Sequence, residues 1–355
     1  MLFDRVLFGG ARGFIGLDIG TNTIKLLEIE ESKGGYRLKN FGIADLPKDS
    51  IVNGSIVNHE GLVTAVQKLI SNLKIKARNT VASISGNPVI IKKITMPLTT
   101  DEELEESIKF EAEQYIPFDL QEVNIDFQIL NVEEEKADQM NVMLVAAKKV
   151  MIEEYTKVLI DSGLKPIILD VDVFALENAF EMSYQVEENQ NIALIDIGAS
   201  TININITKNN VSAFTRDIFL GGNQITEELQ KKFSISFDEA EEMKTGGGLE
   251  GADHGEYEDI IKQGCDNITA EIQKSMEFYT STTYESITKI YLSGGCAKIA
   301  GIRESIEEKL NIPAEIIDCL QNIKYDGSSF DQEYIEDIIP LASVSVGLAL
   351  RRLGD

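Results

Sequence analysis

The sequence predicts an α/β protein in which two similar halves enclose a ligand cleft and the first half carries a small α+β insertion. The main observation is a repeat, because IGLDIGTNTIKL at residues 15–26 returns as ALIDIGASTINI at residues 193–204. A third glycine turn, Gly294-Gly295, follows another apolar strand. The insertion is indicated at residues 89–165, where the pattern becomes strand, helix, strand, charged turn, strand and helix.

Each copy of the repeat reads as two apolar strands joined by a tight turn just after an aspartate. We expect Gly20 and Gly198 to adopt the positive φ of such a turn and to let backbone N–H groups approach an anion. Asp18 and Asp196 would then hold a hydrated divalent cation between the two turns. Lys25 supplies the positive charge that an acidic protein needs beside phosphates.

The composition is that of a globular protein with a strongly acidic charge. The chain has 355 residues, 43% hydrophobic content and a formal net charge of −26, which is enough length for about two domains. This charge argues against a nucleic-acid partner and against non-specific attraction to an anionic membrane surface. Three cysteines without CxxC spacing argue against structural zinc and disulfides, so a cytoplasmic setting is expected. We also expect no signal peptide and no membrane span.

The helices and strands expected along the chain alternate as an α/β fold requires. A Thr99–Glu103 capping signal should open a helix that ends near Tyr115, before Pro117. The expected strands are 15–29 as a hairpin, 36–41, 80–85, 123–130, 142–147, 166–173, a second hairpin from 192, and 289–292. The other expected helices are 60–73, 149–162, 174–180, 223–233, 236–244, 258–283, 302–310 and 340–353, with 246–255 as a surface loop.

Together these motifs resemble the actin/Hsp70/sugar-kinase ATPase superfamily. Residues 15–29 resemble its first phosphate motif, 193–204 its second phosphate motif, and 291–297 its adenosine motif. The small-residue helix at 340–351 completes the likeness. The resemblance implies an actin-like (ribonuclease H-like) fold of duplicated βα halves around a nucleotide cleft.

A narrower resemblance lies in the insertion. EAEQYIPFD at 111–119, followed by VNIDFQIL at 123–130, is similar to the PilM family of type IV pilus assembly proteins, whose cousin is the cell-division protein FtsA. The residues alone favour another interpretation, in which Ile116-Pro117-Phe118 is only a helix stop with a core aromatic, and the resemblance reverses this preference. The implied subdomains are 1A at 1–86 and 165–190, 1C at 87–164, 2A at 191–220 and 288–355 with its last helix against 1A, and 2B at 221–287.

The superfamily resemblance implies ATP and Mg²⁺ as ligands in the cleft. The phosphate and metal contacts implied are Asp18, Gly20, Thr21, Asn22, Thr23 and Lys25 from the first half, and Asp196, Gly198, Ala199, Ser200 and Thr201 from the second. The nucleoside contacts implied are Gly221, Gly222, Glu227, Lys231, Gly294 and Gly295. Asp18 and Asp196 would hold the metal through water.

Hydrolysis of ATP needs a group that positions the attacking water near the γ-phosphate. Asp172 is the candidate, because it follows the strand after which relatives place a Glu or Gln. An equally supported alternative is that Asp172 only caps the following helix. We therefore expect weak ATPase activity or none.

The PilM resemblance implies a protein partner rather than a small substrate. It implies binding of the short cytoplasmic N-terminal peptide of PilN between subdomains 1A and 1C, a link to the pilus motor ATPases, and a cytoplasmic location peripheral to the inner membrane. Because RRLGD at 351–355 directly follows the core helix, we expect no amphipathic membrane helix of the kind with which FtsA-like proteins end, and membrane contact only through partners. Homo-oligomer formation stays open. The alternatives are an FtsA-like cytoskeletal protein, a small-molecule kinase of the superfamily, and a scaffold that has lost its nucleotide.

Overall fold

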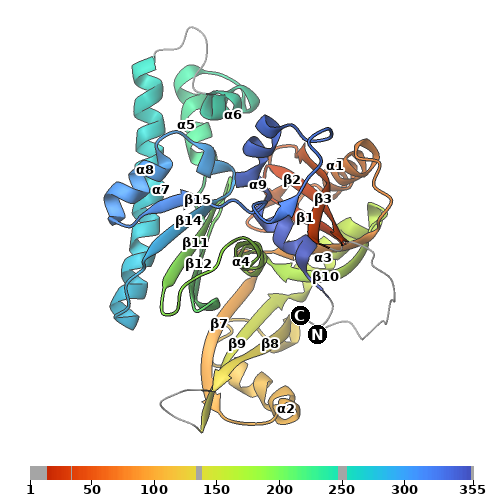
Figure 1. Ribbon diagram of the computed structural model, residues 1–355, viewed down its shortest axis with the longest axis vertical. Coiled ribbons are helices and arrows are strands. Elements are labelled where there is room, and N and C mark those ends of the chain that lie inside the picture. Colours follow the sequence, from red (N-terminus) through yellow and green to blue (C-terminus); the bar gives the residue numbers. More distant parts are fainter. Residues whose placement is uncertain (1–13, 33, 133–137, 247–253, 353–355) are drawn as a thin grey trace.

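The computed structural model describes residues 14–32, 34–132, 138–246 and 254–352. Figure 1 shows two large sheets with helices around them and a third, smaller sheet that projects below. The expected surface loop at 246–255 and the polar turn at 133–141 lie partly outside the described residues. Within the described residues, no helix has the length and apolar character that spanning a bilayer would require.

The first sheet carries the first copy of the repeat and has strand order β10-β6-β1-β2-β3-β16. β1 pairs antiparallel with β2 and parallel with β6, so the expected hairpin is present within a mixed sheet. Its strands are β1 (Ile15–Ile19), β2 (Thr23–Ser32), β3 (Gly35–Asp45), β6 (Asn79–Ile84), β10 (Lys165–Val171) and β16 (Ile323–Lys324). A separate short ribbon pairs β4 (Ile51–Val52) with β5 (Ser55–Ile56). Ile15, Leu17 and Ile19 lie on one face of β1, and they are buried because this face packs into the core of the first half.

The second sheet repeats this arrangement with strand order β13-β12-β11-β14-β15. Again the hairpin strand β11 pairs antiparallel with β12 and parallel with β14. The strands are β11 (Asn191–Ile197), β12 (Ile202–Lys208), β13 (Val211–Ile218), β14 (Lys289–Ser293) and β15 (Ala314–Ile316). The repeat in the sequence therefore corresponds to a repeat in sheet topology.

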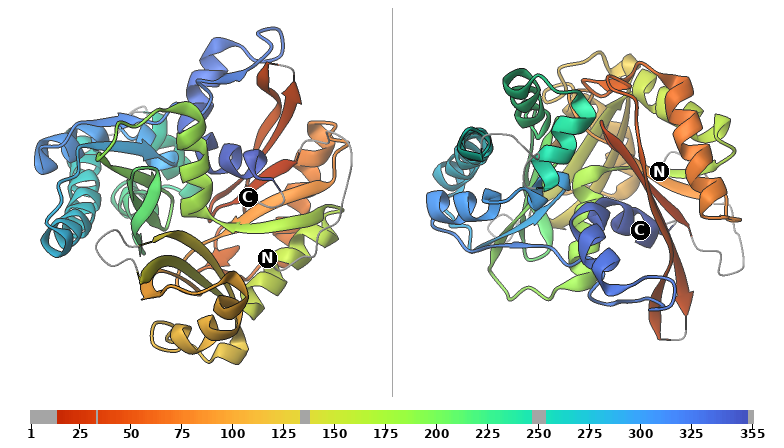
Figure 2. Two further views of the ribbon diagram at one scale, coloured as in Figure 1. Left: turned by 60° about the horizontal axis from the view of Figure 1, so that its bottom comes forward. Right: turned by 90° about the horizontal axis from the view of Figure 1, so that it is seen from above.

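Helices cover the outer faces of both sheets (Figures 1 and 2). α1 (His59–Asn72) and α3 (Lys149–Asp161) share one core with the first sheet. The helices of the second half are α5 (Asn223–Phe233), α6 (Phe237–Gly246), α7 (His254–Thr283) and α8 (Ile302–Leu310), with a short 3-10 helix, η2 (Gly295–Lys298), before α8. α5, α6, α7 and α8 contribute to a single core with β11, β12 and β14.

Two helices, α4 (Asp172–Ser183) and α9 (Gln332–Leu350), lie between the large sheets (Figure 1). α9 begins well before the expected start at residue 340, because the Asp331 side chain caps it by accepting from Tyr334 N at 2.8 Å. Pro340 lies inside the helix, so it did not mark a boundary. A Cβ added at Gly347 would lie 1.7 Å from the carbonyl oxygen of Ala175, so the two helices cross with their backbones in contact.

The insertion forms its own three-stranded antiparallel sheet, in the order β7-β9-β8, with α2 on it. Its elements are β7 (Val89–Pro97), α2 (Asp101–Ala112), the 3-10 turn η1 (Leu120–Glu122), β8 (Val123–Val132) and β9 (Gln139–Lys148). The predicted capping box at Thr100 and Glu103 is present. The predicted end near Tyr115 is wrong, because Tyr115 N and Ile116 N both donate to Ala112 O and the chain turns Ile116 into the core before Pro117.

Candidate functional site

The two repeated hairpin loops meet each other at the boundary between the halves. Thr21 Oγ1 of the first loop lies 2.5 Å from Ser200 Oγ of the second. Beside them, Asn22 Nδ2 donates to Asn223 Oδ1 at 2.7 Å and Asn223 Nδ2 donates back to Asn22 Oδ1 at 3.3 Å. Residues that are about 180 to 200 positions apart are thus in direct contact, as two halves facing one ligand require.

The glycines of the two loops are needed for space, not for a positive φ. The expectation of positive φ at Gly20 and Gly198 is wrong, since neither is among the positive-φ glycines of the described chain. Instead, Gly20 N donates to Thr23 O and Gly198 N donates to Thr201 O, which pulls each loop tight. A Cβ at Gly198 would lie 2.9 Å from Thr201 O, so a side chain there would force the loop open. The remaining loop residues of the prediction, Thr21, Asn22, Thr23, Ala199, Ser200 and Thr201, are all partly buried.

Acidic groups from both halves gather around one lysine just inside the loops. Lys25 Nζ lies 3.2 Å from Asp18 Oδ2, and both side chains are mostly buried. Burial would lower the pKa of Lys25, but the charges of Asp18 and Asp196 together raise it. Burial and the charge of Asp18 raise the pKa of Asp196 to about 6, against the opposing effect of Lys25. The structure therefore joins the predicted carboxylates and the predicted cation in one electrostatic cluster.

Asp172 belongs to the same cluster. It is the first residue of α4, so the N-cap position belongs to Val171, which has no polar side chain that could accept a capping bond, and the interpretation of Asp172 as the cap is wrong. Burial first, and then the charge of Asp18, raise the pKa of Asp172 to about 7. A carboxyl group with a pKa near neutrality can accept a proton from water and release it again at neutral pH.

The raised pKa of Asp172 predicts a stability change with pH. In the unfolded chain this group titrates near 3.8, and in the fold near 7. The unfolded state therefore releases its proton first, and the free energy of unfolding falls as pH rises from about 4 to 7. We expect Asp172→Asn to make this fall smaller, measured by urea unfolding of both proteins at several pH values. Equal pH dependence of parent and variant would contradict a buried, mostly protonated Asp172.

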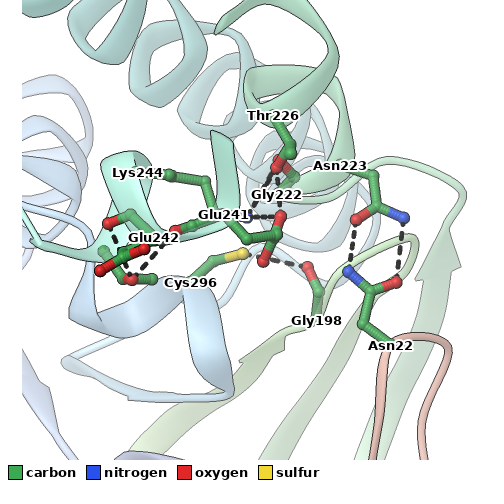
Figure 3. A network of polar contacts seen from close by, with 10 residues as sticks. Asn22, Gly198, Gly222, Asn223, Thr226, Glu241, Glu242, Lys244 and Cys296 are labelled. Carbon is green, nitrogen blue, oxygen red and sulfur yellow. Dashed lines mark hydrogen bonds and ion pairs between the residues drawn. The ribbon is translucent and has the colours of Figure 1, made fainter. Parts of the chain in front are cut away.

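A polar network in the second half lies behind the second loop, where Figure 3 shows it in close-up. Lys244 Nζ, from the buried side of α6, donates to Thr226 Oγ1 at 2.9 Å and pairs with Glu241 Oε1 at 2.5 Å. Thr226 also hydrogen-bonds to Glu241. Cys296 Sγ donates to Gly198 O at 3.1 Å, which ties the turn after β14 to the phosphate loop candidate. The network thus fixes α5, α6 and η2 around one loop.

Of the four glycines predicted at the nucleoside end, Gly221 and Gly294 lie where another backbone segment approaches closely, and Gly222 lies against a side chain. A Cβ at Gly221 would lie 2.5 Å from Gly198 O, and one at Gly222 would lie 2.4 Å from Cys296 Sγ. Gly294 has φ 90°, and a Cβ there would lie 2.4 Å from Ile197 O. Gly295 begins η2 and is less crowded, with Leu341 Cδ2 at 3.5 Å.

The weakest predicted contacts, Glu227 and Lys231, are placed differently from the rest. Both side chains are exposed on α5, whereas Thr226 on the same helix is buried against Glu241 and Lys244. From the sequence, residues 236–244 were predicted only as a capped helix, and no role was predicted for Glu241 and Lys244. Their i, i+3 spacing on a helix that follows the Gly221-Gly222 turn was the available signal.

The residues present fit a polyphosphate better than a metal held by protein alone. The loops offer hydroxyl and amide groups, the Lys25 ammonium and the start of α5, which are the groups that bind phosphates. Among the described residues, no group of three or more Asp, Glu, His or Cys side chains has the arrangement of a metal site. Mg²⁺ here would need phosphate oxygens and water as most of its ligands, which is its usual preference.

Comparison with known proteins gives the same fold. The cell-division protein FtsA of Bacillus subtilis (strain 168) is 21% identical over 320 residues, which cover 84% of this chain and 69% of that protein. FtsA of Streptococcus pneumoniae is 23% identical over 262 residues, and the match covers 66% of this chain but only 56% of that protein. MreB5 of Spiroplasma citri, solved with ADP, has a TM-score of 0.52 at 14% identity and covers 92% of this chain and 98% of that one, which shows the actin-like fold alone.

Two further matches point to one family. A chain of a PilM-PilN type IV pilus biogenesis complex superposes with a TM-score of 0.86 at 27% identity, covering 96% of this chain and 99% of that chain. The family model described as type IV pilus assembly protein PilM matches residues 16–353. The predicted family and the predicted actin-like fold are thus confirmed, and the chain belongs to the PilM family of type IV pilus assembly proteins.

Proposed function

We propose that this chain binds ATP with Mg²⁺ between its two hairpin loops and acts as a cytoplasmic, nucleotide-dependent part of the inner-membrane platform for pilus assembly. The single observation that carries the nucleotide proposal is the cluster of Asp18, Lys25, Asp196 and Asp172 directly behind two touching glycine loops. The raised pKa values of Asp172 and Asp196, beside a mostly buried cation, cost stability, and perturbed groups of this kind cluster at functional sites, which supports a ligand here. Solved MreB5 chains of the same fold carry ADP or AMPPNP, which supports the nucleotide class.

In this proposal each half contributes one side of the phosphate site. Thr21, Thr23 and Lys25 from the first loop, and Ser200 and Thr201 from the second, donate to phosphate oxygens. Bound Mg²⁺ would neutralise part of the phosphate charge, with Asp18 and Asp196 as acceptors for its water ligands. At the nucleoside end, Gly221, Gly222 and Gly294 let the turns pack closely on their neighbours, and Gly295, the least crowded of the four, leaves the backbone accessible to a flat group. Glu241 and Lys244 are better placed than Glu227 and Lys231 to present polar atoms there, because their network reaches Gly222 O.

Asp172 is the proposed water-positioning residue. Its pKa of about 7 leaves much of it protonated at neutral pH. General-base action would therefore be slow, which agrees with weak ATPase activity or none. We propose that the nucleotide mainly holds the two halves in one relative orientation, since its phosphates would contact both loops.

The proposed partner is the cytoplasmic N-terminal peptide of PilN. Support comes from the likeness to a chain of a PilM-PilN complex along 96% of this sequence, including the inserted subdomain. The proposed binding groove lies between subdomain 1A and the insertion, whose β8 is an edge strand that could pair with an extended peptide. Contact with the inner membrane and with the motor ATPases would follow through such partners. The boundaries of subdomains 1A, 1C, 2A and 2B that the resemblance implies are part of this proposal.

We expect a synthetic peptide of the N-terminal cytoplasmic residues of the cognate PilN to bind the chain with a dissociation constant in the micromolar range, about −8 kcal/mol, as is usual for short extended ligands. Calorimetry with and without ATP and Mg²⁺ measures this. A peptide of the same composition in scrambled order is the control. Equal heats from both peptides, in either nucleotide state, would contradict the partner assignment without touching the nucleotide proposal.

A further inference from the structure

One stretch of this acidic chain contains no carboxylate. From Gly61 to Thr100 there is no Asp or Glu, although the chain carries a net charge of −26. The basic residues of this stretch are Lys68, Lys74, Lys76, Arg78, Lys92 and Lys93. This stretch differs in charge from the rest of the sequence. Its positive charges form a cluster only where the fold brings them together.

Half of these six residues gather at one end of the first sheet. Lys74, Lys76 and Arg78 lie on the link from α1 to β6, and all three are exposed. Lys165, at the start of the neighbouring strand β10, joins them, because its N–H donates to Arg78 O at 2.7 Å. We call Lys74, Lys76 and Arg78 the basic end; Lys68 is exposed on the preceding helix.

The basic end lies away from the candidate nucleotide site. β6 and β10 run parallel and both start at this end. Asp172 follows the opposite end of β10, and Asp18 lies near the opposite end of β1, which runs parallel to β6. Phosphate binding therefore does not account for these charges.

Neighbouring acidic side chains do not neutralise these positive charges either. Among the described residues, none of Lys68, Lys74, Lys76 and Arg78 forms an ion pair, and Arg78 donates only to the backbone carbonyls of Ile75 and Ala77, each at 2.8 Å. Lysines elsewhere on the surface do pair, for example Lys208 with Glu285 and Lys274 with Glu271. The loop that carries the basic end is thus held by its own hydrogen bonds while its positive charge stays available.

The surface chemistry favours lipid headgroups over a protein partner. Between Val57 and Leu98 the structure describes every residue and exposes no large hydrophobic side chain, so the link that carries Lys74, Lys76 and Arg78 offers no apolar anchor of the kind that protein interfaces use. A cluster of Lys and Arg without such an anchor suits a delocalised anionic surface, and each such residue near it adds attraction. Since charges are screened beyond about 8 Å at physiological salt, the acids on other faces oppose this contact only weakly.

We propose that the basic end contacts anionic phospholipid headgroups directly and so orients the first half toward the membrane. This inference rests on the proposed function only for placing the chain near a membrane. It modifies the sequence-based expectation that membrane contact is solely indirect, because the local charge differs in sign from the net charge.

The test is co-sedimentation of the full chain with vesicles of equal parts phosphatidylglycerol and phosphatidylcholine, and with pure phosphatidylcholine vesicles. The variant is Lys74→Glu with Lys76→Glu, which leaves the Arg78 hydrogen bonds intact. The matched control is Lys92→Glu with Lys93→Glu, which makes the same change in net charge at exposed positions of the same acid-free stretch, on β7. We expect the parent and the control to bind anionic vesicles at physiological salt, where the acids on other faces are screened, and the first variant to bind at least roughly tenfold more weakly.

Three results would overturn the proposal: no binding of the parent to anionic vesicles, equal binding to both vesicle types, or equal loss in both variants, which would mean that only net charge matters. Tighter binding of the parent to duplex DNA than to anionic vesicles would replace lipid by nucleic acid. Binding of ATP and of the PilN peptide is measured on the same proteins. Retained binding of both in the first variant shows that it is folded, and keeps this inference separate from the proposed function.

Discussion

We expect Asp18→Ala and Asp196→Ala each to weaken binding of ATP with Mg²⁺ by roughly 10–100-fold, the usual effect of losing a group that orients a metal ligand. The reason is their position behind the two touching loops, with Asp18 also paired to Lys25 at 3.2 Å. Calorimetry in Mg²⁺ and in excess chelator measures the change. In chelator the loss should be smaller, because these carboxylates act through the metal and repel phosphate without it.

A matched control for this prediction is Asp161→Ala, which removes an exposed carboxylate that bonds His59 far from the loops. Asp18→Asn is added because Asp18→Ala leaves Lys25 buried without its partner and can destabilise the fold. The site assignment would be wrong if the parent chain bound no ATP, or if both aspartate variants bound it as the parent does. In that case the chain would be the scaffold without nucleotide that the sequence left open.

The second large effect is expected at the crossing of α4 and α9. Gly347→Ala places a Cβ 1.7 Å from Ala175 O, a backbone atom that cannot rotate away. The helices must separate, and we expect a loss of about 3 kcal/mol or more in the free energy of unfolding, at the upper end for overpacked cores. Urea unfolding measures it. Gly327→Ala is the control, since nothing lies within 4 Å of a Cβ there, and it should change stability by less than about 0.5 kcal/mol.

Much of the fold could be predicted because its main features are local and repeated. The hairpin at 15–29, the strand pair at 123–130 and 142–147, and the Thr100 capping box all follow from short-range patterns, and the structure contains each of them. Where prediction failed, a distant contact or a missing signal was the reason. Pro340 was predicted to start a helix. Instead, the Asp331 side chain caps α9, and Pro340 lies in the interior of that helix.

Some residues of the candidate site could likewise be predicted from the sequence, and others could not. Asp18 and Asp196 were evident because they recur with the repeat. Their clustering with Asp172 could be inferred only through the family resemblance, since it depends on the order of strands in two sheets. Glu241 and Lys244 were missed, because whether a charged pair on a helix faces solvent or a neighbouring turn is decided by packing. The sequence likewise could not show that Gly20 and Gly198 are required because a side chain would not fit, and not because the backbone has a positive φ.

The pairing of β16 with β3 has a consequence for the order in which the molecule can be made. Ile323 lies beside Tyr36 in the first sheet, and α9 packs on β1 and β2. A ribosome must therefore release nearly the whole chain before the first sheet gains its last strand and its covering helix. Until then β1 to β3 expose an apolar face, so this half should depend on chaperones during synthesis more than its place early in the chain suggests.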